Sequence, residues 1–183
     1  MGWGSLEEDL LKTTTGRGDD GWTDPGHGNR VEKDDPEIEV YGALDEAAAF
    51  VQFAYSLMRS GDEKEIAAGI RDGLGKVLSE LAQHRGSSAQ SVGEEDLKLI
   101  EQWIERLEVR IGPLSGWAVF GESSAAAALN CARTILRRAE RRLVTRFKTI
   151  DSSNEKILAY LNRLSDLVYL LALYEEKHPG TEP

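Results

Sequence analysis

One stretch of the sequence, residues 125–147, constrains the fold more than any other. Its apolar side chains recur at alternating steps of three and four residues, which places them on one face of an α-helix. They are Leu129, Ala132, Leu136, Ala139 and Leu143. A helix with a single apolar face must bury that face against other elements, so the pattern predicts a helix that packs within a larger bundle.

Arginines lie beside this apolar stripe on the predicted helix. Arg133 falls between two leucines of the stripe, so its guanidinium is partly desolvated and needs a carboxylate partner or an anionic ligand. Arg137 follows one turn later. Both arginines could also simply cover a surface helix. Arg138 and Arg142 are expected on the far side of the helix, in solvent.

Four further segments carry apolar residues at helical spacing. They are residues 36–58, 62–84, 94–110 and 155–177. An Asp-Pro pair, Asp35 and Pro36, is a typical helix start, and a Gly-Pro pair at 112–113 is a typical helix end. No segment convincingly predicts a strand.

The length of 183 residues fits one domain with a sizeable core. The five helical segments predict an all-α five-helix bundle over residues 30–178. A flexible N-terminal arm, residues 1–29, precedes it, and a short tail, residues 179–183, follows it.

The last predicted helix is apolar on most of its sides, which is typical of a helix inside a bundle or at a subunit interface. Asn162, Arg163 and Asp166 interrupt the apolar pattern. Polar groups on such a helix are either paired within the protein or bound to a ligand, and both interpretations remain open here.

Asp45 lies at the edge of the apolar seam of the first predicted helix. It is the best partner in the sequence for a half-buried arginine, and a solvated surface aspartate is the alternative. Glu46, the next residue, lies further round the helix and is expected in solvent.

Residues 13–29 read TTTGRGDDGWTDPGHGN and contain almost nothing to bury, which predicts a loop. A loop of this length is usually functional or disordered. Its glycine-rich backbone could wrap a phosphate chain with main-chain N–H groups, or it could be a flexible tail. It is not a P-loop, because no Gly-Lys-Ser/Thr ends it, and no strand precedes it as in a dinucleotide fingerprint.

The net charge of −10 argues against a nucleic acid or an anionic membrane as the main partner. No apolar run approaches the length of a membrane span, and residues 1–12 do not resemble a signal peptide. Cys131 is the only cysteine, so no intrachain disulfide can form and a cytoplasmic location is expected. Its side chain is expected to be a small buried hydrophobe.

The sequence lacks the side chains that most catalytic mechanisms need. His27, His84 and His178 are scattered, and a di-iron bundle would need two Glu-x-x-His pairs where the chain has one. No Ser-His-Asp or Cys-His set is supported. What remains is an arginine pair, an aspartate, an asparagine and a Gly/Thr/Asp arm, which together suit the binding of a polyphosphate.

Four segments match the signature motifs of one enzyme family, in the same order and at similar separations. They are TGRGDDGWT at 15–23, GNRVEKDDPEIEVYGALDE at 28–46, ALNCARTILRRAERR at 128–142 and YLNRLSD at 160–166. The chain resembles, over almost its whole length, the ATP:cob(I)alamin adenosyltransferases of the propanediol-utilisation type, which include the mitochondrial enzyme.

The resemblance implies a homotrimer of five-helix bundles with a four-helix, ferritin-like core and active sites between neighbouring subunits. The arm of such an enzyme orders over ATP. The positions that would line the nucleotide are Thr15, Gly16, Gly18, Asp19, Gly21, Thr23 and Asn162, with Arg30 and Lys33 near the phosphates. Arg137 would hold the triphosphate, and Arg133 would pair with Asp45 across the subunit contact.

The implied reaction transfers the 5′-deoxyadenosyl group of ATP to the cobalt of cob(I)alamin and releases triphosphate, with Mg²⁺ on the phosphates and no metal held by protein side chains. A cobalamin reductase or an adenosylcobalamin-dependent mutase or dehydratase would be a partner. A trimer that binds ATP and a corrinoid for delivery or regulation, without turnover, is the alternative.

On the corrinoid side, the resemblance implies an aromatic wedge against the lower face of cobalt, and Trp117 stands at that position. Phe120 is expected on the corrinoid side as well. The chain departs from the family there, because Phe120 and Glu122 replace a proline and a glycine. Arg17 and Trp22 replace threonines in the arm. On the first helix, the residues at 47–48 are alanines in place of Asn-Ser.

Overall fold

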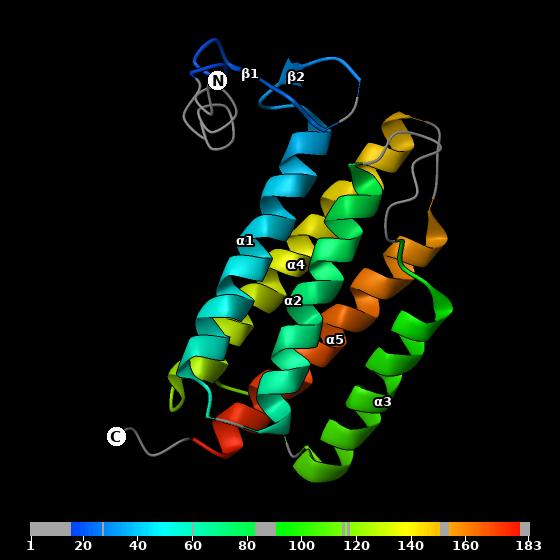
Figure 1. Cartoon of the computed structure of the whole chain (residues 1–183). Helices are drawn as coiled ribbons and strands as arrows, with labels where there is room; N and C mark the ends of the chain where they lie inside the picture. The colour runs from blue at the N-terminus through cyan, green and yellow to red at the C-terminus, as the bar shows by residue number, and fades with distance from the viewer. Residues whose placement is uncertain are drawn as a thin grey trace, which may run out of the picture.

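The structure, a computed structural model, describes residues 16–26, 28–59, 61–82, 91–114, 116, 118–150 and 154–179. Five helices dominate it, which confirms the all-α prediction (Figure 1). They are α1 (Pro36–Leu57), α2 (Asp62–Leu81), α3 (Glu94–Ile111), α4 (Ser124–Thr149) and α5 (Glu155–Lys177). Two short strands, β1 (Trp22–Thr23) and β2 (Val31–Glu32), precede them.

Three of the five helix starts, those of α1, α4 and α5, follow from capping side chains. The Asp35 carboxylate accepts a hydrogen bond from the backbone N–H of Glu37, with Pro36 at the first helical position. Ser123 caps α4 in the same way, and Asn154 caps α5. These are the polar residues that stand just before each apolar pattern, which is why the predicted starts agree with the structure.

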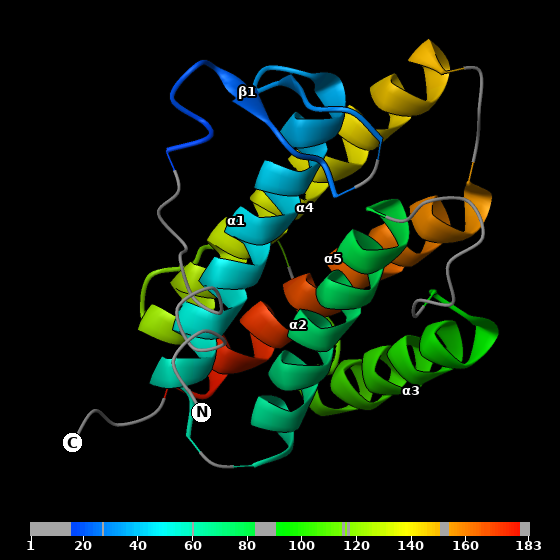
Figure 2. The same cartoon turned by 45° about the horizontal axis from the view of Figure 1, so that its top comes forward.

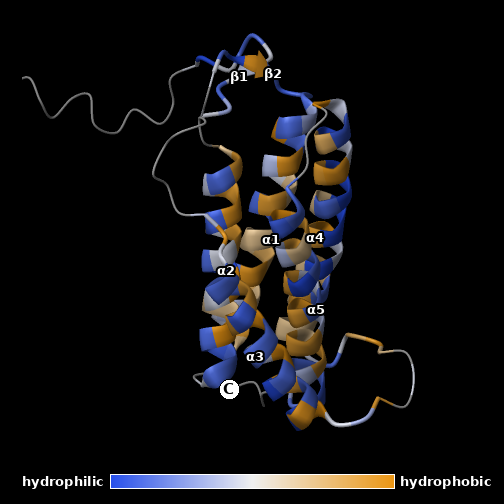
Figure 3. Cartoon of the chain, turned by 90° about the vertical axis from the view of Figure 1, so that its right-hand side faces the viewer, coloured by the Kyte–Doolittle hydropathy of each residue, from blue (hydrophilic) through white to orange (hydrophobic). Residues whose placement is uncertain are grey.

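The apolar stripe of α4 is buried, as the sequence predicts: its five residues are each at most 1% exposed. The helix packs against α1 on one side and α5 on the other, while α2 packs on α1 and α3 packs on α5 (Figure 2). Hydrophobic residues therefore turn toward the inside of the bundle and hydrophilic residues toward its outside (Figure 3).

Helix α5 is the most deeply embedded element of the bundle. Contrary to the expectation from the sequence, this helix alone among the described residues has the length and hydropathy of a membrane-spanning helix, with a mean hydropathy of 1.3 over its most apolar window. However, 56% of that window is buried inside the protein. Burial against α4 and α3 accounts for its apolar character, as the sequence pattern predicts for a helix inside a bundle.

The N-terminal segment contains a feature that the sequence did not predict. Strands β1 and β2 pair antiparallel, with Trp22 opposite Glu32 and Thr23 opposite Val31. Each strand has only two residues, so neither is long enough to display an alternating pattern. The hairpin lies beyond the first turn of α1 (Figure 1). Because β1 precedes residue 30 and β2 follows it, the hairpin spans the predicted boundary between the arm and the bundle.

Cys131 is exposed, so the expectation of a buried cysteine was wrong. It follows the buried Leu129 by two residues, which is about 200° around a helix. Its position therefore turns it away from the α4 stripe.

From the sequence, the arginines on the outer side of α4 were expected to lie in solvent without partners, but the structure shows them paired. Arg138 pairs with Glu46, and Arg142 pairs with Glu39, so that both link α4 to α1. One turn further, Arg146 donates to the buried carboxylate of Glu37 at 2.8 Å. The direct packing of α1 on α4 brings these oppositely charged rows together.

Two glycines of α2 admit aromatic rings from neighbouring helices. A Cβ atom built on Gly69 would lie 2.1 Å from Cη2 of Trp103 on α3, and one built on Gly73 would lie 2.1 Å from the hydroxyl of Tyr160 on α5. Both rings thus pack directly on the α2 backbone, which explains the glycines within this helix.

We expect Gly69→Ala to lower the free energy of unfolding by up to about 2 kcal/mol, because overpacking costs about 1–3 kcal/mol and the better helix propensity of alanine returns only about 1 kcal/mol. Urea unfolding followed by circular dichroism measures the change. The matched control is Gly75→Ala on the same helix. Nothing lies within 4 Å of its Cβ position, and it should stabilise the protein. Equal stabilisation by both variants would show that Trp103 does not pack on Gly69.

Candidate active site

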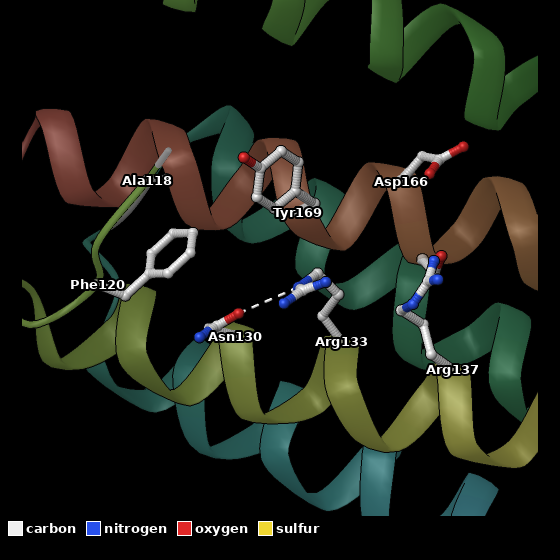
Figure 4. A pocket seen from close by; sticks show the side chains of 8 residues that line it. Ala118, Phe120, Asn130, Arg133, Arg137, Asp166 and Tyr169 are labelled. Carbon is white, nitrogen blue, oxygen red and sulfur yellow. Dashed lines mark hydrogen bonds between the residues drawn. The ribbon is translucent and has the colours of Figure 1, made fainter. Parts of the chain in front are cut away.

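A cavity of about 400 Å³ opens between α4 and α5, beside the segment that leads into α4 (Figure 4). Its wall combines aromatic, amide, carboxylate and guanidinium groups. The lining residues are Ala118, Phe120, Asn130, Arg133, Arg137, Ser165, Asp166 and Tyr169. The cavity therefore has an apolar end near Phe120 and a cationic end near Arg137.

Arg133 is half-buried, as the sequence predicts, and is held by neutral groups. Its Nε donates a hydrogen bond of 3.1 Å to Oδ1 of Asn130, one turn earlier on α4. Its guanidinium carbon lies 5.5 Å from the centre of the Tyr169 ring, a cation–π distance. In the described part of the chain no carboxylate pairs with Arg133, so its charge is oriented but not neutralised.

Arg137 is exposed and lines two cavities, the one above and a smaller one of about 300 Å³ that it shares with Glu140, Arg141 and Val144. Among the described residues it has no hydrogen-bond or ion-pair partner. Arg133 and Arg137 are one helical turn apart, so both guanidinium groups reach the same cavity (Figure 4). The pair forms a positively charged surface that can accept an anion.

The apolar end of the cavity is built by two aromatic rings. Phe120 meets Tyr169 edge to face, with ring centres 6.1 Å apart and an interplanar angle of 76°. This is a favourable aromatic geometry that holds the residues before α4 against α5.

The arm forms a second group of candidate residues. Its glycine-rich turn is closed by backbone hydrogen bonds from Asp19 to Gly16 and from Gly21 to Gly18. Gly16 and Gly21 have φ values of +67° and +83°, a region that favours glycine. The turn therefore depends on the glycines that the arm motif contains.

Arg30 braces this turn from inside the arm. Its Nη1 and Nη2 atoms donate to both carboxylate oxygens of Asp20, at 2.9 and 2.7 Å. Nη2 also donates to the carbonyl groups of Trp22, at 3.0 Å, and Arg17. The hydrogen bond from Arg30 is the main reason why the pKa of Asp20 falls to about 2, and the same pairing raises the pKa of Arg30.

Lys33 is the second cation that the family resemblance places near the phosphates. A Cβ atom built on Gly18 would lie 3.1 Å from its Nζ, so the lysine side chain reaches the turn because Gly18 has no side chain. Within the described residues, its ammonium group has no carboxylate partner. Of the two cations that the resemblance places near the phosphates, Arg30 is therefore already engaged and Lys33 is available to a ligand.

The predicted site residues fall into three groups. Arg133, Arg137 and Phe120 meet at the cavity between α4 and α5. A second group lies in the arm and directly after it, namely Gly16, Gly18, Asp19, Gly21, Thr23, Arg30 and Lys33. Asp45 and Asn162 are both exposed, line neither the α4–α5 cavity nor the arm, and have no partner among the described residues. Thr15 and Trp117 lie outside the described residues.

Within one chain, Asp45 therefore does not contact Arg133. Of the polar residues that interrupt α5, Arg163 pairs with Glu101 at 2.8 Å and with Asp166 at 3.3 Å. This favours structural pairing for Arg163. The pairing of Asp45 with Arg133 across a subunit contact and the nucleotide contact of Asn162 remain predictions.

Sequence reasoning missed Tyr169, Ser165 and Asn130 as cavity residues. Ser165 is only 2% exposed, which is unusual for a hydroxyl side chain on a helix. Ser165 and Tyr169 are four residues apart and thus share one face of α5. The spacing of Ser165 and Tyr169 could have indicated a shared face on α5, but the many apolar residues between and around them made this pattern hard to recognise in the sequence.

Within the described residues, no group of three or more His, Cys, Asp or Glu side chains is arranged to hold a metal ion. His27 and His84, two of the three histidines, lie outside those residues.

Comparison with known proteins matches residues 13–175 to the family described as cobalamin adenosyltransferase. The corrinoid adenosyltransferase of Citrobacter freundii is 34% identical over 173 residues, which cover 93% of this chain and 98% of that protein. The corrinoid adenosyltransferase of Bacillus subtilis is 36% identical over 172 residues, covering 88% of this chain and 85% of that one. The chain spans 49% of the longer PduO relatives of Citrobacter freundii and Salmonella typhimurium.

Solved structures agree in fold. A variant of the PduO-type ATP:corrinoid adenosyltransferase of Lactobacillus reuteri, complexed with cobalamin and ATP, superposes with a TM-score of 0.80 at 28% identity. The match covers 89% of this chain and 92% of that one. With a family match over most of its length and a relative 34% identical along nearly all of that protein, this chain belongs to the cobalamin adenosyltransferase family.

Proposed function

We propose that the protein transfers the 5′-deoxyadenosyl group of ATP to the cobalt of cob(I)alamin, which yields adenosylcobalamin and triphosphate. The observation that carries this proposal is the guanidinium pair of Arg133 and Arg137. Neither has a carboxylate partner among the described residues, and both line one cavity with an aromatic end. Family membership and a relative solved with both cobalamin and ATP support the choice of substrates.

The reaction needs little from protein side chains beyond position and charge. The lone pair of Co(I) attacks C5′ of ATP, the C5′–O bond breaks, and triphosphate leaves with that electron pair. Because Co(I) is itself a strong nucleophile, no general base or covalent side chain is required. The protein must hold C5′ in line with cobalt and stabilise the departing negative charge.

The two ends of the cavity suit the two substrates. The aromatic pair Phe120 and Tyr169 provides an apolar wall for the corrin side, and Arg137 provides a cation for the triphosphate. Arg133, steered by Asn130 and Tyr169, lies between them. Trp117 stays the predicted aromatic wedge below cobalt.

A complete site requires the arm as well, and this supports a composite site between copies of the chain. Trp22 and Arg30 line a separate cavity of about 460 Å³ with the residues that lead into α1, distinct from the α4–α5 cavity. In a homotrimer, the arm of one subunit would cover ATP held by Arg137 of the next. Asp45 would then pair with Arg133 across the contact, and Asn162 would reach the nucleotide.

Arg30 and Lys33 have different roles. Arg30 is engaged by Asp20 and by two carbonyl groups, so it acts as a brace that shapes the glycine-rich turn. Lys33 and the backbone N–H groups of the turn would contact the phosphates. Mg²⁺ on the phosphates would add charge without a ligand set from the protein. A reductase or an adenosylcobalamin-dependent enzyme as partner, and a cytoplasmic location, remain part of this proposal.

The first experiment tests turnover itself. The protein is incubated anaerobically with ATP, Mg²⁺ and chemically reduced cobalamin, and the visible spectrum and the released triphosphate are followed. We expect adenosylcobalamin and triphosphate in equal amounts. Tight binding of both substrates with neither product would instead identify a non-catalytic bundle for cofactor delivery or regulation.

We expect Arg137→Ala to lower kcat/KM by about 100- to 1000-fold, which corresponds to about 2.7–4 kcal/mol of lost stabilisation of the leaving group. Steady-state kinetics with ATP as the varied substrate measures the change. The matched control is Arg138→Ala, which removes the adjacent arginine of α4 that pairs with Glu46 on the outer side. Comparable losses in both variants would remove Arg137 from the mechanism.

We expect Asp45→Asn to weaken subunit association and to reduce activity, because it leaves Arg133 with an uncompensated charge at the proposed contact. Sedimentation equilibrium and steady-state kinetics measure the two effects. Glu46→Gln is the matched control, since Glu46 is the neighbouring acid and pairs with Arg138 within the same chain. If Asp45→Asn keeps both association and activity at the level of the wild type, the pair is not made.

A further inference from the structure

The segment that leads into α4, residues 118–123, is tied to the last turn of α5 by a single carboxylate. Glu176 Oε1 accepts hydrogen bonds from the backbone N–H groups of Gly121, at 3.1 Å, and Glu122, at 2.9 Å. Its Oε2 accepts a third from Ser123, at 3.3 Å. Three consecutive N–H groups of the chain thus converge on one side chain from a residue more than fifty positions away.

This arrangement is electrostatically favourable. The three N–H groups belong to the residues just before α4, and hydrogen bonds to a charged carboxylate are stronger than neutral ones. The carboxylate also lies beside the N-terminus of α4, whose dipole favours a negative charge. The side chain of Ser123 caps α4 separately, through the N–H of Ala126 at 3.2 Å. The Ser123 side chain therefore caps α4, whereas the Glu176 carboxylate holds the backbone of residues 121–123.

The same segment supplies the apolar wall of the cavity. Phe120 directly precedes the three tethered residues, and its ring meets the edge of Tyr169. Tyr169 and Glu176 are seven residues apart on α5, so both lie on the same face of that helix. Helix α5 thus fixes the segment at two points, at an aromatic ring and at the backbone.

We propose that Glu176 is a positioning residue that sets the affinity of the site for the corrinoid, an inference that rests on the proposed function. By holding residues 121–123, the carboxylate keeps Phe120 against Tyr169 and preserves the apolar end of the cavity. The triphosphate end, which Arg137 forms on α4, does not depend on this tether. The effect of Glu176 is therefore specific to one of the two substrates.

The test is Glu176→Ala in the full chain. We expect the KM for cob(I)alamin to rise about tenfold, because the loss of a charge-assisted hydrogen bond to a structured segment is worth about a factor of ten. The KM for ATP should change by less than about twofold. Amide hydrogen exchange over residues 118–123 should accelerate in the variant without substrates.

Two further variants separate positioning from general stability. Glu176→Gln keeps the length of the side chain and one carbonyl oxygen, so its KM for cob(I)alamin should fall between those of the wild type and Glu176→Ala. Ser123→Ala removes the cap of α4 and should lower the melting temperature, while the KM for cob(I)alamin stays near that of the wild type.

The proposal is overturned if Glu176→Ala leaves both the corrinoid KM and the amide exchange unchanged, or if Ser123→Ala raises the corrinoid KM equally. A wild-type protein that forms no adenosylcobalamin would refute the proposed function instead. In that case, unchanged exchange over residues 118–123 in Glu176→Ala would still refute the tether, and faster exchange together with weaker cobalamin binding in equilibrium dialysis would support it.

Discussion

Burial of the α4 stripe determines where every arginine of that helix lies. The stripe faces the inside of the bundle between α1 and α5, and its residues are almost completely buried. Because a helix has a fixed periodicity, this leaves two polar flanks, one turned to α1 and one to α5. Helix α1 presents glutamates along its edge, whereas the facing part of α5 presents Ser165 and Tyr169 beside Asp166.

The two flanks therefore differ in charge balance. On the α1 side, Arg138, Arg142 and Arg146 each meet a glutamate and serve to join two helices. On the α5 side, Arg133 is steered by an amide and an aromatic ring, which orient a guanidinium without neutralising it. Within one chain, Arg133 and Arg137 thus keep local positive charge at one cavity, although the net charge of the chain is −10.

The sequence predicted the helices well because each is specified locally. Capping residues such as Asp35, Ser123 and Asn154 stand directly before apolar patterns of helical period, and these signals do not depend on the rest of the fold. It predicted Arg133, Arg137 and Phe120 as site residues, the last through a family resemblance, and the structure places all three at one cavity.

Contacts between distant elements were harder to predict. The exposure of Cys131 follows from its angular position on α4, which was readable, whereas the pairing of Arg138 with Glu46 depends on which helix lies beside α4. The tether from Glu176 to the residues before α4 likewise joins positions that only the fold brings together. The local sequence pattern determines on which face of a helix a side chain lies. The packing of the helices determines which residues that side chain contacts.

The contrast between Arg30 and Arg137 explains how charge can be prepared for a departing polyphosphate. Arg30 is paired with Asp20, so its charge is already neutralised and stabilises the turn before any ligand binds. Arg137 has no such partner in the described residues and remains exposed, where water solvates it at little cost. A cation that is already neutralised would have to break a pair before it could stabilise the leaving group. Arg137 has no such pair to break, so in the proposed mechanism its charge can stabilise the leaving group directly.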